Sequence, residues 1–146
     1  MPAFRERLLA ASRANRSLLC IGLDPDPALM PVGDTAEFNL AIIDATKDLV
    51  CAYKPNLAFY EALGIDGFRA LEQTVSHIRA AAPGIVVLGD AKRGDIGSTN
   101  ERYARAMFEV WEFDAATVNC YAGGEALEPF LEYEDRGIFV WCRSSN

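Results

Sequence analysis

The segment Ile85-Val-Val-Leu-Gly-Asp90-Ala-Lys92-Arg-Gly-Asp95-Ile-Gly97 decides the fold. It begins as a short apolar run, which is typical of a buried strand, and ends in charged residues. In parallel α/β folds, active sites lie where strands end, so the pattern predicts a site on the loop side. Because side chains alternate along a strand, we expect Asp90 and Lys92 to point the same way. Asp95 follows Gly94 and is expected to lie outside the strand.

Four further apolar segments predict strands, and helical patterns alternate with all five. The strands are expected at 18–23, 49–53, 85–89, 115–119 and 137–142. Phe68 starts an apolar stripe at helical spacing and is expected on the inner face of its helix, with Asp66 just before that helix. Asp34 and Ser98 are each followed three residues later by a glutamate, which predicts two capped helix starts. This alternation indicates a parallel sheet with right-handed crossovers.

Polar residues follow each predicted strand, which is the layout of a (β/α)8 TIM barrel site. The competing fold is a doubly wound sheet, but its usual Gly-rich loop pattern is missing from the sequence. A complete barrel takes about 250 residues, whereas this chain has 146. We therefore expect residues 1–146 to be the N-terminal portion of a single barrel domain, with the first five strands and their helices present and the C-terminal part missing. Such a portion would expose an unpaired sheet edge and is expected to be unstable alone.

The composition disfavours several classes of protein. Acidic residues outnumber basic ones by 21 to 14, which gives a formal charge of -7 and disfavours a general nucleic-acid binder. No apolar run is long enough for a membrane span, and charges interrupt the N-terminus, so we expect a cytoplasmic protein. The four cysteines lack C-x-x-C spacing, which predicts buried, reduced thiols rather than disulfides. With only one histidine, His77, we expect no zinc or other metal site.

Five segments, one near each predicted strand, resemble the orotidine 5′-phosphate decarboxylase family, most closely its bacterial type 2 branch. These segments are Gly22-Leu-Asp-Pro25, Tyr53-Lys-Pro-Asn56, Asp90-Ala-Lys-Arg-Gly-Asp-Ile-Gly97 with Ser98-Thr99, Thr117-Val-Asn-Cys-Tyr121, and Cys142-Arg-Ser-Ser-Asn146. The resemblance implies decarboxylation of orotidine 5′-phosphate to uridine 5′-phosphate and carbon dioxide, a step of de novo pyrimidine biosynthesis. It also implies that no cofactor is used and that the enzyme is a homodimer with shared active sites.

The resemblance assigns three residues to catalysis. Lys92 would stabilise the negative charge that develops at C6 of the pyrimidine and would donate the proton. Asp90 would keep Lys92 ionised and aimed at C6. Asp95 would act across the dimer interface and complete the neighbouring subunit's site.

The resemblance also implies a set of substrate contacts. Two residues would contact the ribose hydroxyls, one would line the pocket beside the base, one would act across the dimer interface, and one would bind the pyrimidine edge; a strand-end asparagine is a weaker candidate. In that order, the residues are Asp24 and Lys54, Ile96, Thr99, Ser145 and Asn119. The family binds the substrate phosphate with loops after strands six to eight, so we expect these 146 residues alone to be inactive.

Three alternatives stay open on the sequence. Asp90 and Lys92 could form a purely structural ion pair, the usual fate of neighbouring opposite charges. The chain could belong to a related barrel enzyme with the same D-x-K-x-x-D element and a magnesium ion, such as 3-keto-L-gulonate 6-phosphate decarboxylase or hexulose-6-phosphate synthase. It could also be a non-catalytic truncated product.

Overall fold

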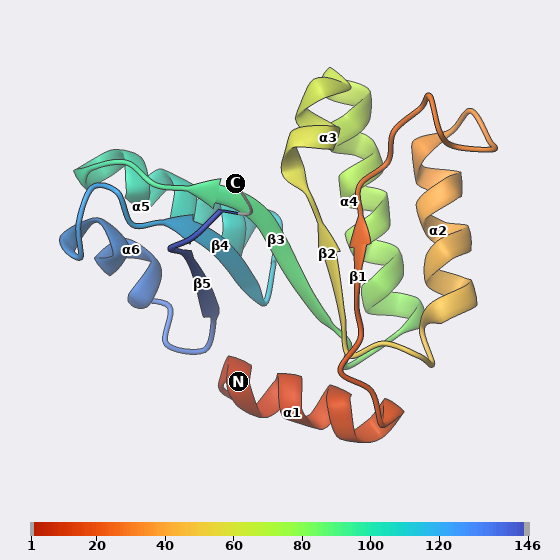
Figure 1. Ribbon diagram of the computed structural model, residues 1–146, viewed down its shortest axis with the longest axis horizontal. Helices are drawn as coiled ribbons and strands as arrows, with labels where there is room; N and C mark the ends of the chain where they lie inside the picture. The colour runs from red at the N-terminus through yellow and green to blue at the C-terminus, as the bar shows by residue number, and fades with distance from the viewer. Residues whose placement is uncertain (1, 145–146) are drawn as a thin grey trace.

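The computed structural model describes residues 2–144, which form one parallel sheet with its helices (Figure 1). The sheet has five strands in sequential order, and every neighbouring pair is parallel. The strands are β1 Cys20–Leu23, β2 Ala52–Pro55, β3 Val86–Arg93, β4 Ala115–Asn119 and β5 Gly137–Trp141. Sequential order with parallel pairing is the strand arrangement of a (β/α)8 barrel, as the sequence predicts.

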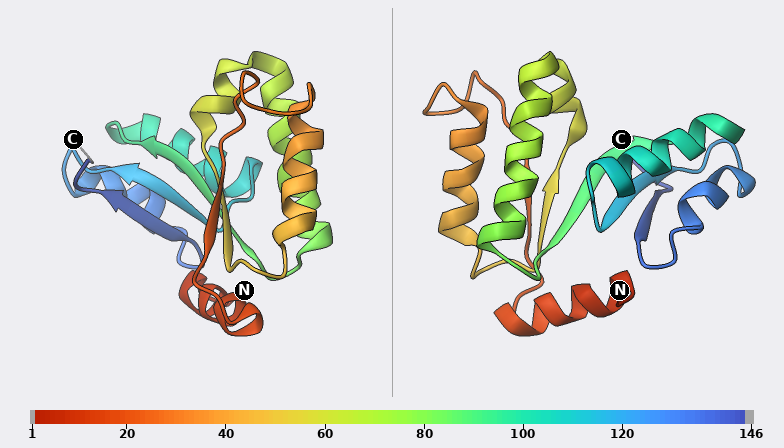
Figure 2. Two further views of the ribbon diagram at one scale, coloured as in Figure 1. Left: turned by 45° about the vertical axis from the view of Figure 1, so that its right-hand side comes forward. Right: turned by 180° about the vertical axis from the view of Figure 1, so that it is seen from behind.

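Helices connect successive strands, and two of them, α2 and α4, pack side by side on one face of the sheet (Figure 2). The helical elements are α1 Phe4–Asn15, α2 Thr35–Thr46, α3 Leu57–Ala62, α4 Gly64–Ala81, α5 Gly97–Arg105, the π-helix η1 Ala106–Val110, the 3₁₀ helix η2 Glu125–Leu127 and α6 Glu128–Leu131. The expected alternation of strands and helices is therefore confirmed.

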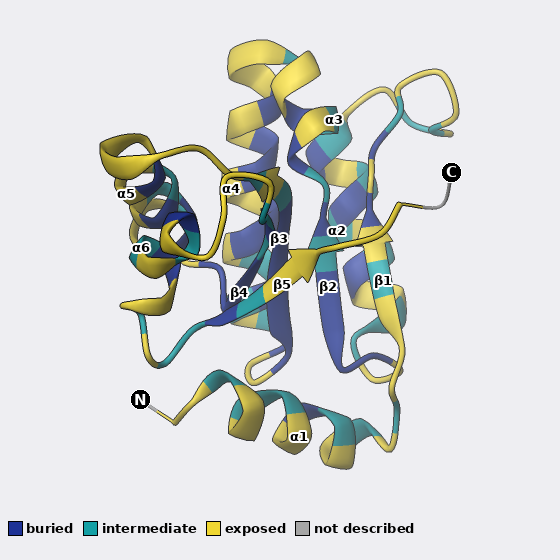
Figure 3. Cartoon of the chain, turned by 60° about the vertical axis from the view of Figure 1, so that its left-hand side comes forward, coloured by how far each residue is buried: buried dark blue, intermediate teal, exposed yellow. Residues whose placement is uncertain are grey.

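The core lies under the central strands, whereas the edges are open (Figure 3). Val86 and Val87 of β3 are almost fully buried, at 1% and 0% exposure. On β5, Phe139 and Trp141 keep 42% and 44% of their surface exposed. Within residues 2–144, β1 and β5 each pair on one side only, so the sheet is an open arc with two free edges. Burial of thiols was therefore overpredicted: Cys20 and Cys142, in or beside these edge strands, are exposed.

Of the three helix starts predicted from the sequence, one is confirmed and two are wrong. The Asp34 carboxylate caps α2 by accepting from the Glu37 amide at 2.8 Å, as predicted. The expected cap at Ser98 is wrong, because α5 already begins at Gly97, whose positive φ of 49° makes the turn into the helix. Asp66 lies inside the first turn of α4 rather than before it, because the helix begins at Gly64.

Two further expectations are wrong in detail. Phe68 is 39% exposed and stacks on Trp111 with ring centroids 5.8 Å apart, so it lies off the inner face of α4. The second strand lies further along the chain than predicted, so Lys54 lies inside β2. This shift follows from the register, which pairs Gly22 of β1 with Lys54.

Helix α1 lies across the end of the sheet at which the strands begin, which we call the floor of the sheet (Figures 1 and 2). Arg7 of α1 donates to the Asp114 carboxylate, which is 2% exposed and also accepts from Arg79 at 2.8 Å and the Val87 amide at 2.7 Å. Asn15 at the other end of α1 donates to the Val50 carbonyl at 2.8 Å. These contacts close the floor and leave the opposite end of the strands for the site. No helix within residues 2–144 has the length and apolar character needed to cross a membrane.

Candidate functional site

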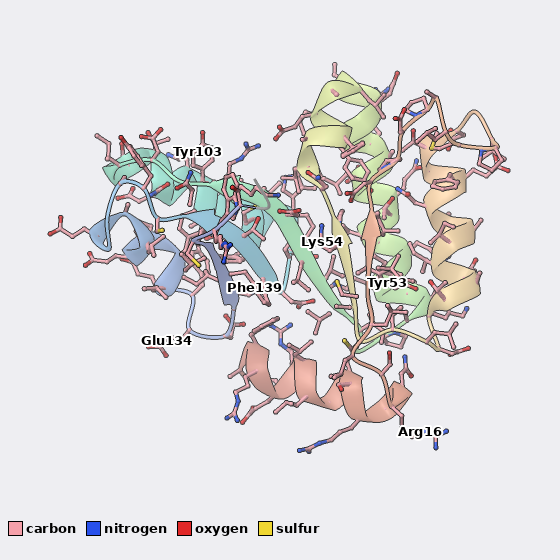
Figure 4. All side chains as sticks on the ribbon, in the orientation of Figure 1. Arg16, Tyr53, Lys54, Tyr103, Glu134 and Phe139 are labelled. Carbon is pink, nitrogen blue, oxygen red and sulfur yellow. The ribbon has the colours of Figure 1, made fainter. Side chains whose placement is uncertain are left out.

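The ends of β2, β3 and β4 bring three polar side chains together around one carboxylate, that of Asp90. Asp90 Oδ1 accepts from Lys92 Nζ at 2.7 Å and from Thr117 Oγ1 at 2.8 Å, while Asp90 Oδ2 accepts from Lys54 Nζ at 2.9 Å. Asp90 is 7% exposed, whereas the side chains of Lys54 and Lys92 are 31% and 40% exposed. The carboxylate is thus at the base of the site, and two ammonium groups lie above it with access from outside. Figure 4 labels Lys54 on β2, the strand next to β3.

The backbone at Lys92 differs from a regular strand. Lys92 has a φ of 50°, a left-handed conformation that is uncommon and strained for a residue with a side chain. The pairing of β3 with β4 shifts its register between Gly89 and Arg93. Strand alternation therefore does not explain why Lys92 and Asp90 meet. Instead, a local twist of the backbone turns Lys92 back over Asp90, while the next side chain, Arg93, pairs with Glu61 of α3.

The environment of Asp90 favours its ionised form. Burial is the largest influence and by itself raises the pKa of the carboxyl group, but the hydrogen bonds from Lys92, Lys54 and Thr117 and the positive charge of Lys54 together outweigh it. The net result is a pKa below the ordinary value for an aspartate. Asp90 is therefore a stable negative charge that can hold two lysines in place.

Asp24 follows β1 directly and is exposed at the same end of the sheet. A buried network fixes the residue before it: the Tyr60 hydroxyl donates to the Leu23 carbonyl at 3.0 Å, and the Asn39 amide donates to both Tyr60 and Thr74 at 3.0 Å. Burial raises the pKa of Tyr60 well above its ordinary range, so the hydroxyl stays protonated and can donate. Three helices, α2, α3 and α4, thus set the position at which Asp24 leaves the sheet.

Asp95, Ile96 and Thr99 are all exposed on the loop and first turn that follow β3. Within residues 2–144, their side chains make no hydrogen bond to Lys54, Asp90 or Lys92. The Asp95 carboxylate instead accepts from the Ile96 amide at 2.7 Å. Ile96 is 71% exposed, which is unusual for a large apolar side chain. Asp95, Ile96 and Thr99 are therefore exposed and are not part of the hydrogen-bonded lysine cluster.

A buried asparagine anchors that loop. Asn100, at 0% exposure, accepts from the Asp95 amide at 2.9 Å and donates to the Asp95 carbonyl at 2.6 Å and the Ala126 carbonyl at 2.5 Å. The loop also passes close to β4, because a Cβ on Gly94 would lie 2.5 Å from the Asn119 carbonyl oxygen. Only glycine fits that position without movement of the chain.

The remaining predicted contacts differ in position. Asn119 ends β4, where its side chain accepts from the Tyr121 amide at 2.9 Å and forms a local turn. Ser145 lies outside the described residues. Trp141 of β5 was not predicted, yet its ring centroid lies 6.0 Å from Lys92 Nζ, at the outer limit for a cation–π contact.

Sequence reasoning missed two residues that position the site, Thr117 and Asn100. Thr117 stands two residues before Asn119 in a predicted strand, so alternation along β4 could have placed it on the same face. Asn100 lies in a helix, and nothing in the sequence distinguishes it from a surface residue. Within residues 2–144, no three His, Cys, Asp or Glu side chains gather in a group that could hold a metal ion.

Comparison with known proteins gives consistent results. Residues 17–146 match the family described as "Orotidine 5'-phosphate decarboxylase / HUMPS family". The chain is 56% identical to the orotidine 5′-phosphate decarboxylase of Roseiflexus sp. (strain RS-1), covering 98% of the chain and 53% of the relative. For Dehalococcoides mccartyi (strain ATCC BAA-2266 / KCTC 15142 / 195), the enzyme of that name is 54% identical, with 98% of the chain and 52% of the relative covered.

The solved structure of Leishmania donovani OMP decarboxylase superposes with a TM-score of 0.87 at 35% identity, over 99% of this chain and 55% of that one. The chain thus spans about half the length of the relatives that it matches. Together with the strand order and the lysine–aspartate cluster, these matches show that the chain belongs to the orotidine 5′-phosphate decarboxylase family.

Proposed function

We propose that this chain supplies the catalytic lysine cluster of an enzyme that decarboxylates orotidine 5′-phosphate. One observation carries the proposal: Asp90 holds Lys92 at 2.7 Å and Lys54 at 2.9 Å at the carboxyl ends of adjacent strands. The buried Asp114 carboxylate also accepts from two cations, Arg7 and Arg79, but at the opposite end of the sheet. The two lysines on Asp90 instead lie, partly exposed, at the end of the parallel strands where active sites are found. Two ammonium groups on a single buried carboxylate leave an excess of positive charge, which suits a site that must stabilise a developing negative charge.

The chemistry follows from that charge. As the C6–carboxylate bond breaks, carbon dioxide leaves and the bonding electron pair stays on C6 as a carbanion-like centre. The Lys92 ammonium would stabilise that charge electrostatically and transfer one N–H proton to C6. The resulting neutral amine would regain its proton from water. Asp90 takes no part in bond making, but it keeps Lys92 protonated and aimed until the transfer.

The other predicted residues would bind and position the nucleotide. Asp24 and Lys54 are proposed to bind the ribose hydroxyls on the family resemblance: Asp24 follows β1 directly, and Lys54 of the neighbouring strand β2 belongs to the cluster around Asp90. Asp95 and Thr99 are proposed to reach the site of a second subunit, since their side chains are exposed and make no hydrogen bond to the lysine cluster within residues 2–144. Ile96 would line the pocket beside the base, and its 71% exposure leaves the side chain accessible for that contact.

Ser145 and Asn119 are proposed as further substrate contacts. Ser145 is proposed to bind the pyrimidine edge on its family resemblance alone. Asn119 is the weaker candidate, since its side-chain oxygen already serves the Tyr121 amide. Phosphate contacts are proposed to come from the part of the barrel that the relatives have beyond the matched segment. We therefore expect the 146-residue chain alone to be inactive.

The test uses a completed barrel, which we define as this chain joined to the part of the Roseiflexus relative that follows the matched segment. Release of carbon dioxide and formation of uridine 5′-phosphate from orotidine 5′-phosphate are measured. We expect catalytic turnover in the completed barrel, and turnover that survives a strong chelator such as EDTA. Failure of the completed barrel, when it is folded and the parent relative is active, would contradict the proposed function. Loss of activity with EDTA and recovery with magnesium would instead favour the related magnesium-dependent enzymes.

A further inference from the structure

We propose that Thr117 is a positioning residue for decarboxylation, because its hydroxyl fixes both the Asp90 carboxylate and the strained backbone at Lys92. The inference rests on the proposed function and gives a role to Thr117, which lies in one of the segments that resemble the family but has no function assigned by that resemblance. Thr117 lies on β4, a strand away from the residues that it would control.

The Thr117 hydroxyl uses its full hydrogen-bonding capacity. It accepts from the Ala91 amide at 3.0 Å and the Lys92 amide at 2.9 Å, and it lies 2.8 Å from Asp90 Oδ1. A threonine hydroxyl has one proton and two lone pairs. Because two N–H donors occupy the lone pairs, the proton has only Asp90 to bind. The direction of this hydrogen bond is thereby fixed, and Asp90 Oδ1 must act as an acceptor.

The backbone turn at Lys92 and the orientation of the Asp90 carboxylate both depend on one atom, Thr117 Oγ1. Lys92 holds a left-handed φ of 50°, which persists in a protein only where surrounding contacts favour it. The two amide donors on either side of that turn both end on Thr117 Oγ1. Asp90 in turn accepts from Thr117 and Lys92 on the same oxygen, Oδ1. A change at Thr117 would therefore release the turn that carries Lys92 and rotate the carboxylate that aims it.

Thr117 is not proposed to touch the substrate, which gives the role a specific signature. Loss of the hydroxyl should lower kcat, because Lys92 is misaligned, while KM for orotidine 5′-phosphate changes little. It should also move the acidic limb of the pH–rate profile to higher pH, because Asp90 loses a hydrogen bond that favours its charged form. The other groups that face Asp90 are Lys54 from β2 and Lys92 from β3, and both remain in the variant.

The experiment compares Thr117→Val, Thr117→Ser and Thr46→Val in the completed barrel. Thr46 is the matched control: its hydroxyl makes hydrogen bonds to the Ile42 carbonyl and Tyr53, but it lies in α2 away from the cluster. For Thr117→Val we expect kcat to fall about tenfold to a hundredfold, the range for one hydrogen bond to a charged group. Thr117→Ser should restore most of the rate, and Thr46→Val should keep the wild-type kcat. Amide hydrogen exchange at Ala91 and Lys92 is measured in the same proteins and should speed up only in Thr117→Val.

The possible results distinguish a failure of the proposed decarboxylase function from a failure of the proposed positioning role of Thr117. An inactive but folded wild-type barrel contradicts the proposed function, while the exchange rates still report whether Thr117 holds the turn. A Thr117→Val variant with wild-type kcat and unchanged exchange at Lys92 overturns the positioning role. Equal loss of kcat in folded Thr117→Ser and Thr117→Val overturns it too, since serine keeps the hydroxyl. Should Thr117→Val not fold, Thr117→Cys replaces it with the same expectations, because a thiol is only a weak partner.

Discussion

Lys92 Nζ lies 2.7 Å from Asp90 Oδ1, although the backbone at Lys92 is left-handed and departs from regular strand geometry within β3. A conventional strand would bring the two side chains to one face without strain. Here the contact depends on a turn that must be held by other groups. Strained residues of this kind concentrate at functional sites, where the surrounding structure fixes an otherwise unfavourable geometry. The pair is thus better explained as part of a reactive site than as a surface ion pair.

The lowered pKa of Asp90 predicts how acid affects stability. Because folding lowers this pKa, the ionised carboxylate stabilises the folded state at pH above the ordinary aspartate range, and that stabilisation is lost as the pH falls through the lowered pKa. Asp90→Asn should therefore have a lower melting temperature than wild type at pH 7, and the gap should narrow from about pH 4 downward.

Thermal unfolding of the completed barrel between neutral pH and about pH 3 measures this gap. Asp66→Asn is the control, because the Asp66 side chain is 88% exposed and forms only a surface pair with Arg69. Its melting temperature should follow wild type throughout. A gap between Asp90→Asn and wild type that stays constant with pH would refute a stabilising charge at Asp90.

Asp114 predicts a stability effect without a catalytic one. Its 2% exposed carboxylate joins Arg7 of α1, Arg79 of α4 and the Val87 amide of β3 at the floor of the sheet. Asp114→Ala leaves these donors without their acceptor and should destabilise the fold by roughly 3 kcal/mol, the low end for a broken buried pair because the arginines are partly exposed.

Chemical unfolding of the completed barrel provides the measurement. The control is Asp135→Ala, because the Asp135 carboxylate is 32% exposed and, within residues 2–144, pairs only with Arg136, at 3.7 Å. It should cost less than about 1 kcal/mol. Equal costs for the two variants would show that the floor cluster does not hold α1 and α4 to the sheet.

The exposed loop with Asp95 predicts that active sites are shared between subunits. When inactive Lys92→Ala and Asp95→Ala barrels are mixed, one of the two sites in each hybrid dimer would receive both an intact Lys92 and an intact Asp95. We expect activity to return after subunit exchange, up to the fraction of sites so restored. Native mass spectrometry of the mixture checks that hybrid dimers form. Hybrids without activity would place Asp95 outside the neighbour's site.

Much of the architecture could be predicted because it depends on simple periodic patterns. Apolar runs followed by charged residues marked the strands, and β4 was predicted with its observed bounds. The edges were harder. Cys20 and Cys142 belong to residue types that are usually buried, but β1 and β5 border an open arc and leave them exposed. The exposure of a side chain on an edge strand depends on whether another element pairs with or covers that strand. A local sequence pattern does not contain this information.

The candidate site, like the fold, could be predicted only in part. The sequence predicted that Asp90 and Lys92 would meet, but it attributed the contact to strand alternation, whereas the cause is a turn held from β4 by Thr117. The motif names residues close in sequence, while Thr117 acts on residues more than twenty positions earlier. Asn100 was missed for the same reason, since its partners include the distant Ala126 carbonyl. Long-range hydrogen bonds of this kind have no periodic signature.

The central claim is that the Lys92 ammonium stabilises the charge at C6 and delivers the proton. The most direct measurement is kcat for orotidine 5′-phosphate in the completed barrel with Lys92→Ala, beside uridine 5′-phosphate binding and the melting temperature of the same variant. The account predicts a loss of kcat of about a thousandfold or more, with product binding and folding retained. A folded Lys92→Ala barrel that turns over near the wild-type rate would contradict it.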